Sequence, residues 1–202
     1  MPRRKAEPAP AAAGLGGEGC LQGLPPIADA RTRLLILGSF PSQRSLAEQR
    51  YYAHPRNQFW AILQAIWPCS PLLTGAGSYE KRSEWLLAHG LGLWDVYAAC
   101  ERQGSLDAAI RQGELNDFAT LRRRCPQLLA VGFNGGESHR HAEAVAASLG
   151  APPLALHRLP STSPAHASWS FERKLAAWGE VLQAHGLGRS PGPARDLAVG
   201  SR

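Results

Sequence analysis

Short apolar runs alternate with amphipathic stretches through the middle of the chain. Four runs have the length and composition of buried strands, at residues 33–38, 91–97, 128–133 and 154–159. Runs that are apolar throughout, with helices between them, are typical of a parallel sheet covered on both faces. The pattern therefore predicts an α/β fold.

Six further segments have the pattern of helices. In the last of them Leu175, Trp178 and Leu182 recur on one face, which is the spacing of an amphipathic helix packed against a core. Asn116 is a residue type that caps helix N-termini, and Gly150 is a type that ends helices. The predicted helices span residues 57–67, 79–89, 105–111, 116–124, 136–149 and 168–185.

Both ends of the chain differ in composition from this central part. Residues 1–30 and 186–202 are rich in Ala, Pro and Gly, so we expect two disordered tails around one domain that spans residues 31–185. The net charge is +6 and most of it falls within that domain. A mildly basic domain is compatible with binding a polyanion.

The sequence predicts a soluble cytoplasmic protein. The segment after Arg3 and Arg4 is interrupted by Glu7 and Glu18, unlike the apolar core of a signal peptide, and no stretch is long enough to span a membrane. The four cysteines show no CxxC pair and no zinc-ligand spacing, which favours free thiols in a reducing compartment and predicts no metal site.

Candidate chemistry follows the ends of three predicted strands, where parallel α/β sheets bind their ligands. The segment from Tyr51 to Trp60 gathers aromatic, amide and basic groups, which suits a planar, hydrogen-bonding ligand such as a nucleobase. Asn57 could instead cap the following helix, and Phe59 could belong to that helix's buried face.

A carboxylate and two polar loops complete the set of candidates. Asp95 interrupts an apolar run, where a carboxylate is costly unless it is functional, lies at an exposed strand end or pairs with Arg102. The loop of residues 159–167 and the turn at 133–136 could hold phosphates through hydroxyls and backbone N–H groups, or could be ordinary turns. His54 and His166 could contact DNA or be merely solvated.

Five motifs in order along residues 31–185 resemble the DNA-deoxyinosine glycosylases, a branch of the uracil-DNA glycosylase superfamily. The resemblance implies a three-layer α/β/α sandwich with a central four-stranded parallel sheet. It implies excision of hypoxanthine, and sometimes of uracil, from DNA without a metal or cofactor. The motifs are GSFP at 38–41, YYAHPRNQFW at 51–60, GLWDV at 92–96, FNGG at 133–136 and LPSTSPAHA at 159–167.

The resemblance also implies roles for single residues. It makes Asn57 the catalytic residue, and it matches the superfamily's base-stacking Phe to Phe59, with Phe40 or Tyr52 as further stacking residues. Asp95 stands where the best-known members have the Asn that reads uracil.

The resemblance implies DNA contacts as well. Serine hydroxyls would clamp phosphates and His166 would fill the gap left by a flipped nucleotide, but the superfamily's catalytic His is replaced by Ser161. The predicted DNA-binding residues are Ser39, Ser42, Asn134, Ser161, Ser163 and His166.

We therefore expect a monomer that acts on double-stranded or single-stranded DNA containing a deaminated base. Three alternatives are open: a uracil or mixed-base glycosylase, a non-catalytic damaged-DNA-binding module, and an enzyme of free nucleosides. Excision assays on several lesions would separate the first two, and insensitivity to salt would indicate the third.

Overall fold

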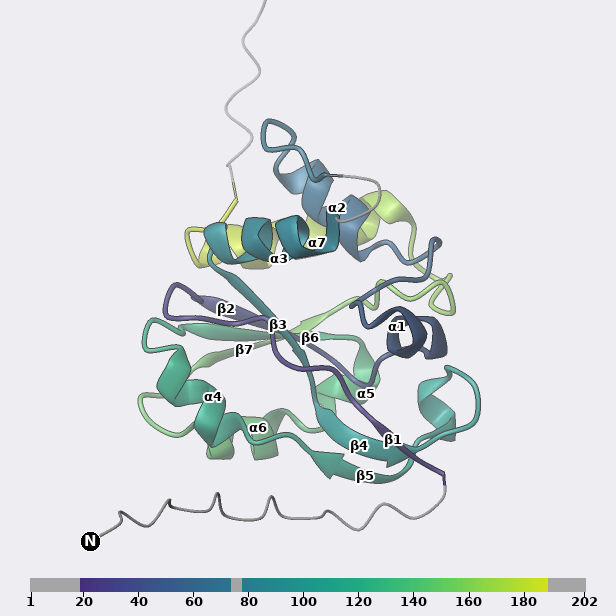
Figure 1. The fold of residues 1–202 in the computed structure, drawn as a ribbon. Coiled ribbons are helices and arrows are strands. Elements are labelled where there is room, and N and C mark those ends of the chain that lie inside the picture. Colours follow the sequence, from purple (N-terminus) through teal and green to yellow (C-terminus); the bar gives the residue numbers. More distant parts are fainter. Residues whose placement is uncertain (1–18, 74–77, 189–202) are drawn as a thin grey trace, which may run out of the picture.

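A four-stranded parallel sheet forms the centre of the molecule (Figure 1). The computed structural model describes residues 19–73 and 78–188. The strands lie in the order β3 (Leu91–Asp95), β2 (Leu34–Gly38), β6 (Ala130–Asn134) and β7 (Ala155–Leu159), and each adjacent pair is parallel. The predicted central sheet is confirmed, and β2 and β3 are buried throughout because helices cover both faces.

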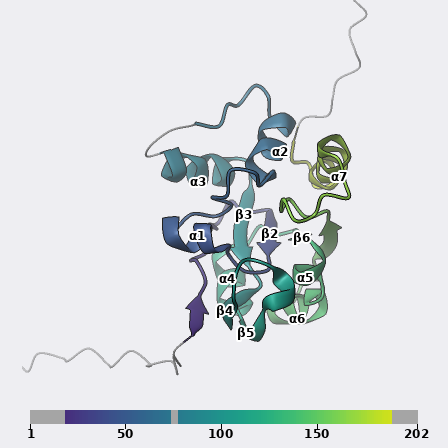
Figure 2. The ribbon, with the colours of Figure 1, turned by 90° about the vertical axis from the view of Figure 1, so that its right-hand side faces the viewer.

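Helices form a layer on each side of this sheet (Figures 1 and 2). Trp178 and Phe59 are fully buried under one layer and Phe118 under the other, so apolar side chains on both faces make one core. One layer holds α2 (Phe59–Ile66), α3 (Ser78–Ala88) and α7 (Phe171–Ala184), and the other holds α4 (Phe118–Arg124), α5 (Gly136–His139) and α6 (Ala142–Leu149).

A second, antiparallel sheet extends the fold beyond β3. It consists of β1 (Cys20–Gln22), β4 (Tyr97–Glu101) and β5 (Arg111–Leu115), with β4 in the middle. The sequence pattern missed it because β5 is exposed at every position and β1 has only three residues. The helix predicted at 105–111 is only the short 3₁₀ helix η1 (Asp107–Ala109).

The tail boundaries also need correction. Residues 19–30 were assigned to a disordered tail, but β1 pairs with β4, Leu24 is buried, and Ile27 forms a bridge with Leu93. At the other end Leu187 is buried, so the folded part continues past residue 185. The remaining parts of the predicted tails, 1–18 and 189–202, lie outside the described residues.

Two helices differ from their predicted form. The helix expected at 136–149 is divided into α5 and α6, with Arg140 and His141 between them. The cap of α4 is Asp117, whose side chain accepts the N–H of Thr120. The side chain of Asn116 instead donates to the carbonyl of Asp95 and ties the start of α4 to the end of β3.

Strand register brings the candidate loops to one edge of the sheet. Gly38 at the end of β2 lies beside Asp95 at the end of β3, and Asn134 at the end of β6 lies beside Leu159. The chain leaves β2 toward one helical layer and leaves β6 toward the other, so a crevice opens between these two strands, as at other switch points of parallel sheets. The loop before α2 contains the short helix α1 (Gln43–Glu48), which stands at this edge (Figure 1).

Two searches of the described residues gave negative results. None of the helices there has the length and apolar character needed to cross a membrane. The same residues include no cluster of three or more His, Cys, Asp or Glu side chains able to hold a metal ion.

Candidate active site

A cleft of about 790 Å³ lies at the carboxyl ends of the central strands. Its size is within the range of small-molecule sites, and its walls come from the loops after β2, β6 and β7, from Asp95 and from residues 105–108 between β4 and β5. The structure brings together every predicted site residue except Phe59. The lining includes Ser39, Phe40, Ser42, Tyr52, Asn57, Asp95, Asn134, Ser161, Ser163 and His166.

Phe59 is the exception, and its predicted stacking role needs correction. Its side chain is fully buried and does not line the cleft. Its ring is stacked on that of Tyr52 at a centroid distance of 4.2 Å and meets Trp178 edge-on. Phe59 therefore has no free face for a base, and the phenyl and phenol rings of the cleft lining are those of Phe40, Tyr51 and Tyr52.

The position of Tyr52 is fixed from several sides. Its φ of 53° lies in the left-handed region, which non-glycine residues rarely adopt. Its hydroxyl accepts a hydrogen bond from Nδ2 of Asn134 at 2.8 Å, and Phe59 supports its ring. Such strain persists only where the surroundings over-determine a conformation, and it concentrates at functional sites.

Asp95 is buried at the floor of the cleft. Only 4% of the residue is exposed, and Oδ2 has no hydrogen-bond partner among the described residues. Burial raises the pKa of the carboxyl to about 8, although the nearby charge of Arg102 opposes that rise. Both rival interpretations fail, because Asp95 is neither exposed nor ion-paired with Arg102.

Glycine is required next to Asp95. A Cβ at Gly38 would overlap Oδ1 of Asp95 and approach the hydroxyl of Tyr52. The glycine of the GSFP motif therefore lets the backbone of β2 approach these two side chains closely. This packing explains why a side-chain-free residue ends the first buried strand.

Asn57 both caps a helix and faces the cleft. Its Oδ1 accepts the N–H of Phe59 at 3.0 Å, at the start of α2. The expected capping role is thus real, although Gln58 is the formal cap residue. The Oδ1 atom has a second lone pair that can accept another hydrogen bond. Nδ2 has no hydrogen-bond partner among the described residues, so both atoms of this fixed amide are available to a ligand.

Asn134 joins the turn after β6 to the loop after β7. Its Nδ2 donates to Tyr52 and to Thr162, and its Oδ1 accepts the N–H of Thr162 at 2.9 Å. Tyr52 lies in the loop after β2 and Thr162 in the loop after β7, so Asn134 holds two walls of the cleft together. Thr162 is fully buried, and the sequence analysis did not single it out.

The predicted DNA-contacting serines already make local hydrogen bonds. Ser42 caps α1 by accepting the N–H of Ser45, and Ser39 donates to Asp107 at 2.5 Å. Ser161 and Ser163 accept the N–H groups of the residues two positions further on. These bonds shape the loops and leave further lone pairs or hydroxyl protons at the cleft surface.

Lys174 is a functional candidate that the sequence analysis missed. It is 2% exposed, and its ammonium donates to Oε1 of Gln58 and to the carbonyl of His166, both at 2.9 Å. It therefore ties the loop after β7 to the start of α2. Its spacing offered a signal, because Lys174 shares the buried face of α7 with Trp178 and Leu182.

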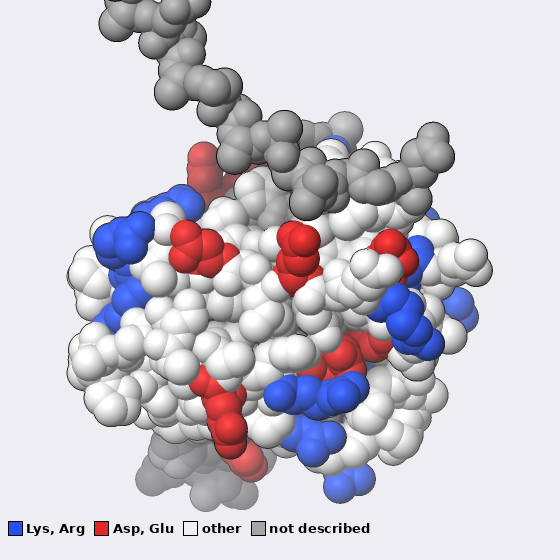
Figure 3. Space-filling view, turned by 90° about the horizontal axis from the view of Figure 1, so that it is seen from below, with Lys and Arg blue, Asp and Glu red and all other residues white. Residues whose placement is uncertain are grey.

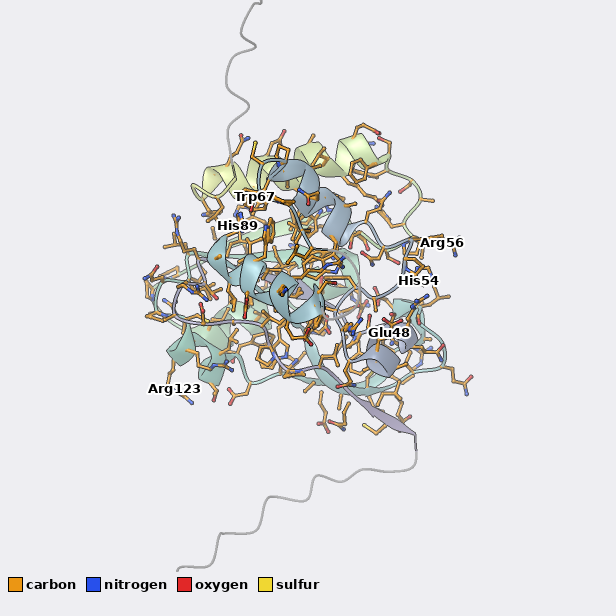
Figure 4. The ribbon with its side chains drawn as sticks, turned by 45° about the horizontal axis from the view of Figure 1, so that its top comes forward. Glu48, His54, Arg56, Trp67, His89 and Arg123 are labelled. Atoms are coloured by element: carbon orange, nitrogen blue, oxygen red, sulfur yellow. The ribbon has the colours of Figure 1, made fainter. Side chains whose placement is uncertain are left out.

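Two arginines lie at the mouth of the cleft, and one of them, Arg44, is ion-paired with Glu48. Arg44 and Arg56 line the cleft and are exposed, and Figure 4 shows Arg56 and His54 at the outer edge of the molecule, apart from Trp67 and His89. On the face opposite α2, α3 and α7, acidic and basic side chains are interspersed (Figure 3). This distribution favours the cleft mouth as the place where an anionic ligand would bind.

A parallel α/β sheet with a cleft at its switch point, lined by amides, hydroxyls and aromatic rings, defines a protein built to bind a planar polar ligand. The sequence profile of the uracil DNA glycosylase superfamily matches residues 25–183. The chain belongs to this superfamily. The match starts before residue 31, in agreement with the packed N-terminal segment.

Two relatives within reach of this comparison are named hypoxanthine DNA glycosylases. A hypoxanthine DNA glycosylase of Methanosarcina acetivorans is 35% identical over 80% of this chain and 98% of its own length. A hypoxanthine DNA glycosylase of Methanosarcina barkeri is 41% identical over 58% of this chain and 72% of its own length.

A solved structure agrees with the fold. The solution NMR structure of a Methanosarcina acetivorans protein, provisionally named a uracil DNA glycosylase, superimposes with a TM-score of 0.69 at 34% identity. The alignment covers 83% of this chain and 99% of the other.

Proposed function

We propose that this protein is a DNA glycosylase that removes hypoxanthine from DNA by hydrolysing its N-glycosidic bond. Its superfamily and the names of its relatives support this activity. The observation that carries the proposal is the cleft, where Asn57, Tyr52 and Asp95 line a space large enough to admit an everted base. A base within a duplex is inaccessible, so the nucleotide has to flip out first.

The neutral form of Asp95 suits the edge of hypoxanthine. With a pKa of about 8, the carboxyl is protonated at pH 7 and has both a donor and an acceptor. Hypoxanthine presents a donor at N1 and an acceptor at O6 on adjacent atoms, so one carboxylic acid can pair with both. A protonated carboxyl also avoids the repulsion that a carboxylate would exert on a departing base anion.

Asn57 is proposed to orient the attacking water. Its Oδ1 is held by the N–H of Phe59, so the amide is fixed before the substrate binds. When the bond between C1′ and N9 breaks, its electron pair leaves with the base and the water oxygen bonds to C1′. The water proton passes to the base or to solvent. A neutral amide suffices where departure of the base, rather than attack, dominates the barrier.

The loops around the mouth are proposed to hold the DNA backbone. Ser39, Ser42, Ser161 and Ser163 would contact phosphates, with Asn134 keeping their loops together. His166 lies at the rim, where its side chain could replace the everted base in the stack. The tightly held loop carbonyl of His166 supports a fixed position for this residue.

We also propose that the protein acts as a monomer in the cytoplasm, on double-stranded or single-stranded DNA. Cys20, Cys100 and Cys125 form no disulfide with one another, which suits a reducing compartment.

The direct test is excision from matched duplexes that contain hypoxanthine, uracil or xanthine at one position, followed by alkaline cleavage. We expect strand breaks at hypoxanthine, the base in the names of the two Methanosarcina relatives. Uracil is the second candidate, because a G/U mismatch-specific uracil DNA glycosylase of Schizosaccharomyces pombe is 31% identical over half of this chain. Absence of abasic sites from all three duplexes would refute the proposed activity.

A further inference from the structure

Arg102 carries a charge that the fold buries without a direct ion pair in the described part of the chain. It follows β4, and only 8% of the residue is exposed. Its Nη2 donates to the carbonyl of Pro41, whereas Nε and Nη1 have no hydrogen-bond partner in residues 19–73 and 78–188. No carboxylate of the same residues forms an ion pair with it. A buried, incompletely satisfied charge is costly, so its position calls for a functional reason.

Phe40 separates this charge from the cleft. The Cζ atom of Arg102 lies 5.0 Å from the centroid of the Phe40 ring, the geometry of a cation–π contact. Phe40 lines the cleft and Arg102 does not, so the ring stands between the guanidinium and the ligand space. A cation at an aromatic ring draws electron density toward itself, which reduces the ring's repulsion of a negative group on the cleft side.

The cleft needs a positive charge at this place. Hydrolysis leaves negative charge on the departing base, and the site has to stabilise it. The carboxyls that line the cleft, Asp95 and Asp107, have the wrong sign when ionised, and both interact electrostatically with Arg102. The cations in the lining, Arg44 and Arg56, are exposed at the mouth and screened by solvent.

One other buried cation is near the cleft. Lys174 does not line it, and its ammonium is occupied by Gln58 and His166 beside the loop after β7. Arg102, by contrast, is directly behind a ring of the proposed base pocket. Arginine also stays charged when buried, which lysine often does not.

We propose that Arg102 is a positioning residue that stabilises the departing base anion from behind Phe40. The inference rests on the proposed glycosylase function. It adds the group that stabilises the negative charge of the leaving base. Arg102 forms no bond with the base, and the electron pair of the broken bond stays on the base. Because the charge appears only as the bond breaks, Arg102 raises the rate of excision more than the affinity for DNA.

The test compares leaving groups of the same shape within one preparation. Single-turnover rates are measured for Arg102→Met and Arg102→Lys on DNA that contains hypoxanthine or 8-azahypoxanthine, whose extra ring nitrogen stabilises the anion. Arg122→Met is the matched control, because Arg122 also donates to backbone carbonyls but lies away from the cleft. The ratio of the two rates does not depend on the fraction of protein that is folded.

We expect Arg102→Met to slow hypoxanthine release about 10-fold and 8-azahypoxanthine release clearly less, with unchanged affinity for DNA. Arg102→Lys should restore part of the loss, and Arg122→Met should leave the ratio of rates unchanged.

Three outcomes would overturn the proposal. Equal losses of the single-turnover rate on both bases would mean that Arg102 only anchors the carbonyl of Pro41. Failure of both Arg102 variants to fold, while Arg122→Met folds, would assign it a structural role. A wild-type protein inactive on every lesion would refute the glycosylase function itself and this inference with it.

Discussion

At the residue scale, Asp95 combines deep burial in the cleft with the largest consequence for recognition. Its Oδ2 has no partner in the described part of the chain, and its pKa is raised to about 8 because water is excluded. This unpartnered oxygen bears on the choice of substrate, because a neutral carboxylic acid can pair with a donor and an acceptor at the same time. The protonation state of one side chain thus decides what the cleft can bind.

A pH dependence follows from this pKa. Between pH 4 and 8 the folded protein holds a proton on Asp95 that the unfolded chain releases, so stability decreases as pH rises through this window and is constant above it. We expect the free energy of unfolding to fall by about 2–4 kcal/mol more between pH 5 and 9 in the wild type than in Asp95→Asn. Urea unfolding at both pH values measures this difference.

Excision should follow the same ionisation. We expect the wild-type rate to decrease above about pH 8, as the carboxylate begins to repel the departing base. Glu114→Gln, on exposed β5, should keep the wild-type profile of both rate and stability. A wild-type stability curve that runs parallel to that of Asp95→Asn from pH 5 to 9 would contradict the raised pKa.

The residues also show how far sequence reasoning reaches. Spacing and residue type placed Asn57, Tyr52 and Asp95 in one cleft, because strand ends in a parallel sheet converge. The stacking role that the resemblance implied for Phe59 failed, whereas the alternative from helical spacing, a place on the buried face of the following helix, is confirmed. Only the packing of Phe59 between Tyr52 and Trp178 decides between these two interpretations.

At the scale of secondary structure, α7 does more than cover the sheet. Lys174 on its buried face reaches from the helix to the carbonyl of His166 and the side chain of Gln58. The helix thereby holds the loop after β7 against the start of α2. A single buried ammonium sets the position of the loop that is proposed to contact DNA.

Replacing this lysine should affect DNA binding more than chemistry. Lys174→Met leaves the His166 carbonyl without its donor, at a cost of about 1–3 kcal/mol, and loosens the loop. We expect affinity for a lesion-containing duplex to fall about 10-fold while the single-turnover rate at saturating DNA changes less than about 3-fold. Titration of fluorescent DNA measures the affinity, with Glu180→Gln on the exposed side of α7 as the control. Unchanged affinity together with a lost rate would contradict this role.

The elements predicted from sequence are those with strong patterns. The four parallel strands were found because short apolar runs indicate buried strands, and α2 and α7 because their apolar residues recur at helical spacing. Strand β5 was missed because an exposed strand has no apolar alternation, and β4 because it follows β3 after a single residue, Val96. The break between α5 and α6 has no proline or glycine to mark it, so a continuous helix was the natural expectation.

At the scale of the whole molecule, the three-layer fold brings segments that are distant in sequence to one edge of the central sheet. The loop after β2, the end of β3 and the loops after β6 and β7 meet there although they are spread over more than 120 residues. Asp95 and Asn57 come from opposite sides of that edge, one from the sheet and one from the start of α2. Catalysis by this fold therefore depends on positions that tertiary structure alone makes adjacent.

The central claim is that Asn57 acts on a base everted into this cleft, and one measurement tests it most directly. This is the single-turnover excision rate of Asn57→Ala at saturating hypoxanthine-containing DNA, with Gln22→Ala on exposed β1 as the control. The account predicts a rate about 100-fold or more below the wild type, with affinity for DNA nearly unchanged. Equal rates for Asn57→Ala and the wild type would contradict it.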